Sequence, residues 1–325
     1  MVSVAFAFFL AGLLTRSEHP LRDSSVIART PDKFVLTTET GKKAFALYEP
    51  VVITYSVVNP TNEVIRGIVR MAVENRRIDF SITDPQGMTH PYQSGEIADG
   101  VLLERDFPPG LVGISEVEMI WNAATREFSF PGPGRYTIRA RMSVGSALSK
   151  DSIQSSYLTA APIEIVVTDP SGVDLEAMRF FSSVEDFKRL VRYGAGEYCK
   201  GTPAVECFDQ LSSFLHQHPD SAYTPEILWD LAESVATGML DVSPRSQTAI
   251  DLYSTFLRRW NNHPAAPRVM YRLAMALDAA GRKQEAVDLV GRFETTFPGR
   301  QDLLDQMRMN ILHVRPLNQS PIPKS

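Results

Sequence analysis

The sequence has few of the residues and motifs that support chemistry at an active site. Its 325 residues include two cysteines and six histidines, and no histidine lies in a His-Glu-x-x-His or comparable metal-binding motif. It also has no Gly-x-Ser-x-Gly elbow, Walker loop or dinucleotide-binding fingerprint. We therefore expect a protein that is not an enzyme and that needs no metal or cofactor. An active site assembled from distant residues, or an enzyme inhibitor, stays open as an alternative.

Clusters of positive charge and long apolar runs are also missing. The formal net charge is −5 and no run of Lys and Arg stands out, so we expect no nucleic-acid binding, which needs a concentrated positive field. No stretch reaches the roughly 20 apolar residues of a membrane-spanning helix. The uncharged apolar run from Val4 to Leu14 has the length of a signal-peptide core.

This N-terminal run predicts a leader over residues 1–29 and a periplasmic or secreted protein. No Lys or Arg precedes the run, and no clear Ala-x-Ala cleavage site follows it. A retained N-terminal anchor, a buried core element, and a cytoplasmic protein with a misread N-terminus therefore stay open as alternatives. Beyond this segment we expect no integral membrane span.

The two cysteines, Cys199 and Cys207, lie close together on either side of a segment that contains a glycine and a proline. In an oxidising compartment such a pair is expected to form a disulfide that closes the turn. Two free thiols are the main alternative. A zinc site would need two further ligands, and only His216 and His218 are near in the sequence.

From Phe34 to Thr168 the apolar residues recur with a period of two. Short alternating runs have turn signals rich in Pro, Gly, Asn and Asp beside them: such a turn follows 78–82, and another precedes 136–142. This pattern predicts an antiparallel β-sandwich over residues 30–170. Glu116 and Glu118 fall on one face of a strand, and we expect that face to be solvated.

Two segments of this half carry a resemblance. Residues 48–59 and 130–138 are similar to strands of immunoglobulin-like domains found in exported bacterial proteins, although the two immunoglobulin cysteines are absent. The resemblance implies the sandwich fold and says little about function. Trp121 is expected to pack in the core or at its rim, or alternatively to form a sugar platform. A surface adhesin or carbohydrate-binding module that acts through the sandwich loops is therefore the alternative function.

After residue 170 the hydrophobic period changes to that of helices, and the sequence repeats itself. The segment that begins at Pro225 matches the one that begins at Pro267, and a His-Pro pair precedes each. Residues 267–298 resemble a tetratricopeptide repeat, and the style is similar to periplasmic proteins of outer-membrane assembly and cell-division coordination. The resemblance implies an all-α array of helical hairpins over 171–315, followed by a disordered tail at 316–325.

In arrays of this family, peptides lie in a groove that the first helix of each hairpin lines. Carried onto this sequence, the register puts eight residues in a predicted groove: Glu226, Trp229, Glu233 and Ala236 from one unit, and Arg268, Tyr271, Met275 and Asp278 from the next. The alternative is that both aromatic rings pack against adjacent helices. We expect a non-enzymatic exported scaffold or adaptor that binds a protein or peptide partner. Because the array has few repeats, we also expect the sandwich or another chain to pack on the first hairpin.

Overall fold

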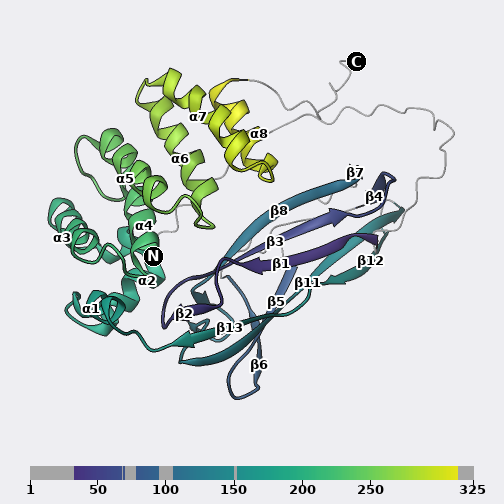
Figure 1. Cartoon of the computed structure of the whole chain (residues 1–325), viewed down its shortest axis with the longest axis horizontal. Helices are drawn as coiled ribbons and strands as arrows, with labels where there is room; N and C mark the ends of the chain where they lie inside the picture. Colours follow the sequence, from purple (N-terminus) through teal and green to yellow (C-terminus); the bar gives the residue numbers. More distant parts are fainter. Residues whose placement is uncertain (1–32, 68, 70–77, 95–104, 150–151, 314–325) are drawn as a thin grey trace.

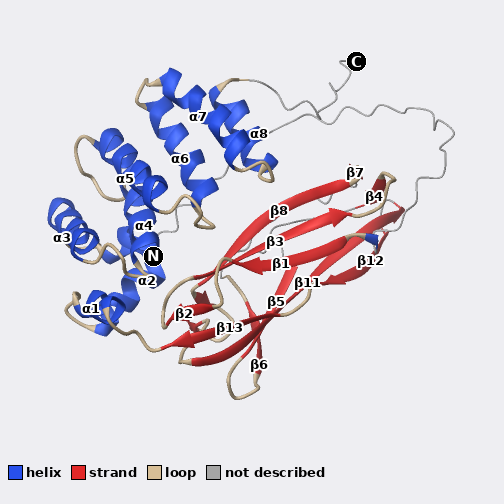
Figure 2. Cartoon of the chain, in the orientation of Figure 1, coloured by secondary structure: helices blue, strands red, loops and turns tan. Residues whose placement is uncertain are grey.

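The computed structural model describes residues 33–313 except 68, 70–77, 95–104 and 150–151. Within that part, strands occupy the chain from Val35 to Thr168 and helices occupy it from Val173 to Ile311. The protein therefore combines a β half with an α half that follows it (Figures 1 and 2). The expected leader and the expected disordered tail both lie outside the described residues.

The β half contains a three-stranded and a larger sheet, in which neighbours pair antiparallel except β2 and β13. The smaller sheet has the order β1 (Val35–Thr40), β3 (Val51–Asn59), β8 (Gly110–Met119). The larger has the order β2 (Ala44–Ala46), β13 (Ile163–Thr168), β11 (Gly134–Ser149), β5 (Ile78–Thr83), β6 (Thr89–Tyr92), and β12 (Ser152–Thr159) also pairs with β11. Two short ribbons pair β4 (Ile65–Gly67) with β7 (Arg105–Phe107) and β9 (Trp121–Asn122) with β10 (Glu127–Phe128).

The two sheets share one apolar core. The alternation in the sequence puts every second side chain of β3 inside, so that Ile53, Tyr55 and Val57 are buried. The Tyr55 ring packs edge to face against Phe80 of β5, with 5.8 Å between the ring centroids. Because residues of both sheets belong to this one cluster, each sheet buries its apolar face against the other.

The α half consists of helices that pack mainly against their neighbours in the chain (Figure 1). They are α1 (Val173–Arg179), α2 (Val184–Tyr198), α3 (Ala204–Gln217), α4 (Thr224–Thr237), α5 (Arg245–Arg259), α6 (Ala266–Ala279), α7 (Lys283–Thr296) and α8 (Gln301–Ile311). Ala274 of α6 and Ala286 of α7 are fully buried, and Gly281 between these helices has φ of +78°, a backbone conformation that glycine adopts at little cost. Cys199 and Cys207 are joined by a disulfide between α2 and α3.

The two halves are in direct contact. Tyr48, between β2 and β3, packs against Phe187 of α2 with 6.5 Å between ring centroids, and the Tyr223 hydroxyl donates to the carbonyl oxygen of Leu47 over 2.8 Å. Ile120, directly after β8, packs against the core of the α half. The contact covers part of the outer face of β8. In the part of the chain that the structure describes, no helix is long and apolar enough to cross a membrane.

Candidate partner-binding site

Two residues of the predicted groove contact the chain's own β8 strand. Arg268 Nε and Nη2 each lie 2.9 Å from Glu116 Oε2, and the Glu226 carboxyl is hydrogen-bonded to that of Glu118. Glu226 is only 9% exposed. This end of the predicted groove is therefore filled by the β half, and Glu226 is not accessible to a partner.

The aromatic residues of the predicted groove contact neighbouring helices. The ring centroids of Trp229 and Tyr253 are 5.9 Å apart, and Asn310 Nδ2 of α8 donates to the Tyr271 hydroxyl over 3.2 Å. Glu233 Oε1 accepts a hydrogen bond from the Tyr253 hydroxyl over 2.6 Å. Both rings thus make the packing contacts that the alternative interpretation expected.

Three further residues complete the predicted set. Met275 is half-buried and packs against the core of the α half. Asp278 is half-buried, and Ala236 is exposed near the end of α4. The structure therefore does not gather the eight predicted residues into one open surface.

The expectation that Glu116 and Glu118 face solvent is wrong. The Glu116 side chain is 4% exposed, because α6 and α8 cover it. Its Oε1 accepts from Arg300 Nη1 over 2.6 Å, and Arg300 in turn donates to Asp302 from Nε and Nη2, each over 3.1 Å. Alternation along a strand shows which residues share a face, but it does not show what packs on that face.

A cluster of carboxyl groups lies buried where β8 meets α4. Burial raises the pKa of Glu118, and it raises the pKa values of Glu226 and Asp230 well above their ordinary range. Negative neighbours add to the effect: Glu118 acts on both α4 groups, and Asp230 also acts on Glu226. Two carboxyl groups that hydrogen-bond to each other must share a proton. The cluster is therefore at least partly protonated in the folded protein.

His263 borders this cluster as a neutral ring. Its Nδ1 accepts a hydrogen bond from the backbone N–H of Ala265 over 3.2 Å, so the ring proton is on Nε2, which lies 3.5 Å from Glu226 Oε1. A second ring proton would have to bind Nδ1, where it would point at the Ala265 N–H, so this hydrogen bond opposes protonation of the ring. Burial, with a smaller effect from the charge of Lys42, lowers the pKa of His263 to about 4.

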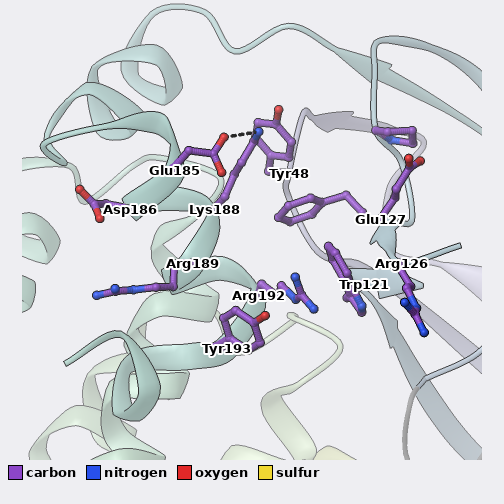
Figure 3. Close-up of a pocket in the computed structure, with 12 residues that line it drawn as sticks. Tyr48, Trp121, Arg126, Glu127, Glu185, Asp186, Lys188, Arg189, Arg192 and Tyr193 are labelled. Carbon is purple, nitrogen blue, oxygen red and sulfur yellow. Dashed lines mark hydrogen bonds and ion pairs between the residues drawn. The ribbon is translucent and has the colours of Figure 1, made fainter. Parts of the chain in front are cut away.

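A hollow of about 650 Å³ lies between the β9–β10 ribbon and α2, where the two halves meet (Figure 3). We call it the junction pocket. Aromatic rings of the β half face basic and aromatic side chains of α2 across it. The side chains that matter below are those of Tyr48, Trp121 and Phe128 on one side, and those of Lys188, Arg192 and Tyr193 on the other.

Arg192 lies between two aromatic rings. Its Cζ is 3.1 Å from the centroid of the Trp121 ring and 4.4 Å from that of Tyr193. Tyr193 is 50% exposed, so the arrangement faces solvent. Within the described residues, the Arg192 guanidinium forms no ion pair. No acceptor among the described residues binds its N–H groups, so they are available to an external acceptor.

Other pocket residues are tied by contacts within the chain. Lys188 Nζ lies 2.8 Å from Glu185 Oε1, the interaction drawn in Figure 3, and 5.2 Å from the centroid of the Tyr48 ring. Arg189 donates to the carbonyl oxygen of Tyr198 over 2.8 Å. Of the three basic residues that α2 contributes to the pocket, Arg192 is therefore the one that has no carboxylate or carbonyl partner in the described structure.

Local structure fixes both walls of the pocket. Buried Asn122, next to Trp121, donates from Nδ2 to the Pro91 carbonyl over 2.8 Å and accepts at Oδ1 from the N–H of Gln93 over 3.1 Å. On the other wall, Ser183 Oγ accepts from the Asp186 N–H over 3.1 Å and caps α2. The β9–β10 ribbon and α2 are thereby held in place before any ligand binds.

Sequence reasoning missed this pocket. It singled out Trp121, but its partners Arg192 and Tyr193 resemble any solvent-facing pair on a helix. Gly194, which follows them, has φ of +73° and kinks α2, and a Cβ atom there would lie 3.3 Å from the Asp230 carboxyl group. A glycine within an otherwise helical pattern was the one local signal of an irregularity at this place.

No protein-family model matches the chain, and no curated protein matches it. Solved structures with weak similarity include the β-glucosidase EmGH1 from Erythrobacter marinus, which is 15% identical over 39% of this chain and 15% of that chain, with a TM-score of 0.21. A β-glucosidase from Listeria innocua is 15% identical over 39% and 16%, with a TM-score of 0.19. BslA, a bacterial hydrophobin, is 16% identical over 43% of this chain and 97% of that chain, with a TM-score of 0.19. Similarities this weak carry no argument about the fold or the function.

Proposed function

We propose that this chain is an exported, non-enzymatic scaffold that binds a protein partner at the junction pocket. The observation that carries the proposal is the Arg192 guanidinium held between Trp121 and Tyr193, facing solvent and without an ion pair in the described structure. Aromatic and arginine side chains in a preformed hollow are the residue types that dominate binding energy at protein interfaces.

The proposal includes a finer interpretation of both halves. We interpret the β half as an immunoglobulin-like sandwich, which the common core of its two sheets supports. We interpret the α half as a short tetratricopeptide-like array, which the buried alanines and the Gly281 turn support. The halves meet at the pocket, so a partner bound there would contact both.

The disulfide supports export, because such bonds persist in oxidising compartments. We propose that the protein acts in the periplasm or as a secreted protein.

The junction pocket is a better candidate for the partner site than the predicted groove. Glu226 and Arg268 bind β8, and Arg192 binds no carboxylate in the described structure. Trp121 is a poor sugar platform, because Arg192 covers one face of its ring.

Affinity capture from envelope extracts tests this function. The full chain is the bait, with Trp121→Ala as the pocket variant and Tyr157→Ala as the control. Tyr157 is a matched choice, since it is 57% exposed and the Arg141 guanidinium lies 4.3 Å from its ring centroid. We expect one protein that the wild type and Tyr157→Ala retain and that Trp121→Ala loses. Retention by all three chains, or by none, would contradict the proposal.

A further inference from the structure

The chemistry of the junction pocket points to one class of ligand. The Arg192 guanidinium lies close to the rings of Trp121 and Tyr193, and a guanidinium donates hydrogen bonds only from its edges, in its own plane. That planar set of donors fits the two oxygens of a carboxylate, which accept two parallel N–H bonds. The contacts with Trp121 and Tyr193 also restrict the orientation of the cation, so less side-chain entropy is lost on binding.

The acidic residues around the pocket leave Arg192 available. Glu185 is paired with Lys188, and Asp186 Oδ2 accepts from the Ser183 hydroxyl over 3.0 Å at the start of α2. Glu127, on the β10 side, is exposed and is drawn apart from Arg192 in Figure 3. Within the described residues, therefore, no carboxylate of the chain already occupies the position that a ligand carboxylate would take.

We propose that the junction pocket binds a carboxylate group carried by a peptide segment of the partner, with Arg192 as its bidentate donor. Trp121 and Tyr193 hold the guanidinium in place, and the rings of Tyr48 and Phe128 form an apolar wall beside it. The preferred segment therefore has an aromatic or aliphatic residue next to the carboxylate. The carboxylate belongs either to an acidic side chain or to the C-terminus of the segment. This inference rests on the proposed function, because the peptide stands for part of the partner.

Fluorescence anisotropy with three labelled peptides tests the inference on the full chain. The first peptide, Ala-Phe-Glu-Phe-Ala with an amidated end, has a side-chain carboxylate. The second replaces Glu by Gln and has none, and the third has Gln with a free C-terminal carboxylate. We expect the first or the third to bind at least about 10-fold more tightly than the second, since a hydrogen-bonded charge pair contributes about 1.5–3 kcal/mol.

The substitution Arg192→Lys keeps the charge but removes the planar pair of donors. We expect it to reduce the preference for the carboxylate peptide by about 10-fold, whereas the control Arg141→Lys leaves it unchanged. Tyr193→Leu, at a half-exposed position, is a second variant in case Arg192→Lys does not fold, and it should weaken the same preference.

Several results would overturn the inference. They are equal binding of the three peptides, binding of none, an unchanged preference in Arg192→Lys, and binding of polygalacturonate in place of the peptides. If affinity capture finds a partner that depends on Trp121 but the peptides show no preference, the carboxylate assignment fails and the proposed function stands. If Trp121 does not affect capture either, both fail.

Discussion

The ion pairs of Glu116 connect the two halves, and the substitution Glu116→Gln tests how much they contribute to stability. Glu116 accepts from Arg268 at one oxygen and from Arg300 at the other, and the side chains of Glu116 and Arg300 are 4% and 9% exposed. Glutamine keeps the shape but removes the charge, and its amide N–H groups would face one of the two guanidinium groups. Arg300 would keep only Asp302 as a partner.

Removal of one partner from a buried ion pair costs about 3–5 kcal/mol. We expect the lower end, about 3 kcal/mol, because Asp302 still neutralises Arg300 and because the Arg268 side chain is 40% exposed. With about 2.1 cal/mol/K of unfolding entropy per residue over 325 residues, that loss lowers Tm by about 4–5 °C. The control is Glu164→Gln, since Glu164 pairs with Arg135 at the surface with side chains 63% and 71% exposed. Such a pair contributes less than about 1 kcal/mol.

Differential scanning calorimetry measures both variants against the wild type. The two halves have two distinct apolar clusters, with Ala46 of β2 in that of the α half, so Glu116→Gln is also expected to separate their unfolding into two transitions. A Tm within about 2 °C of that of Glu164→Gln, with a single transition, would refute the argument that this network connects the halves.

Three further predictions concern buried titratable groups and the disulfide. Because the pKa of Glu226 is raised in the folded state, the free energy of unfolding should fall as the pH rises above about 4.5. The substitution Glu226→Gln should reduce this fall, whereas the control Glu206→Gln, at an exposed site, should not. Urea unfolding from pH 4 to pH 8 measures both variants. The pKa of His263 is lowered to about 4, so its contribution to stability should be lost as the pH falls from 6.5 towards 4; an NMR titration midpoint near 6.5 would contradict this. The double substitution Cys199→Ser and Cys207→Ser should cost about 2.5 kcal/mol, from the entropy of so short a closed loop, and an unchanged urea midpoint would show that the disulfide does not stabilise the fold.

Much of the local structure was predictable from the sequence. The alternation over residues 78–82 predicted that Ile78, Phe80 and Ile82 face one way, and they lie in the core. The resemblance of residues 267–298 to a tetratricopeptide repeat implies small side chains where the helices of a hairpin cross, and Ala274 and Ala286 are fully buried. These features depend on residues close in the sequence, so a periodic pattern contains the information.

The candidate site was not predictable in the same way. Arg192 lies against Trp121 because a ribbon of the β half and a helix of the α half meet there, and no local pattern encodes that contact. The burial of Glu116 has the same origin, since its two arginine partners come from residues 268 and 300. The repeat register placed Glu226 and Arg268 in a groove because it took no account of the β half, which fills that end.

Site-specific photo-cross-linking in the living host tests the central claim most directly, namely that a protein partner binds at the junction pocket. Tyr193 is replaced by benzoylphenylalanine in the full chain, and Tyr157, a similarly exposed tyrosine stacked with an arginine on the β half, is replaced in a parallel control. We predict one discrete cross-linked protein at position 193, absent at position 157 and lost when Arg192→Lys is added. No cross-linked protein at position 193, or the same protein at both positions, would contradict the account.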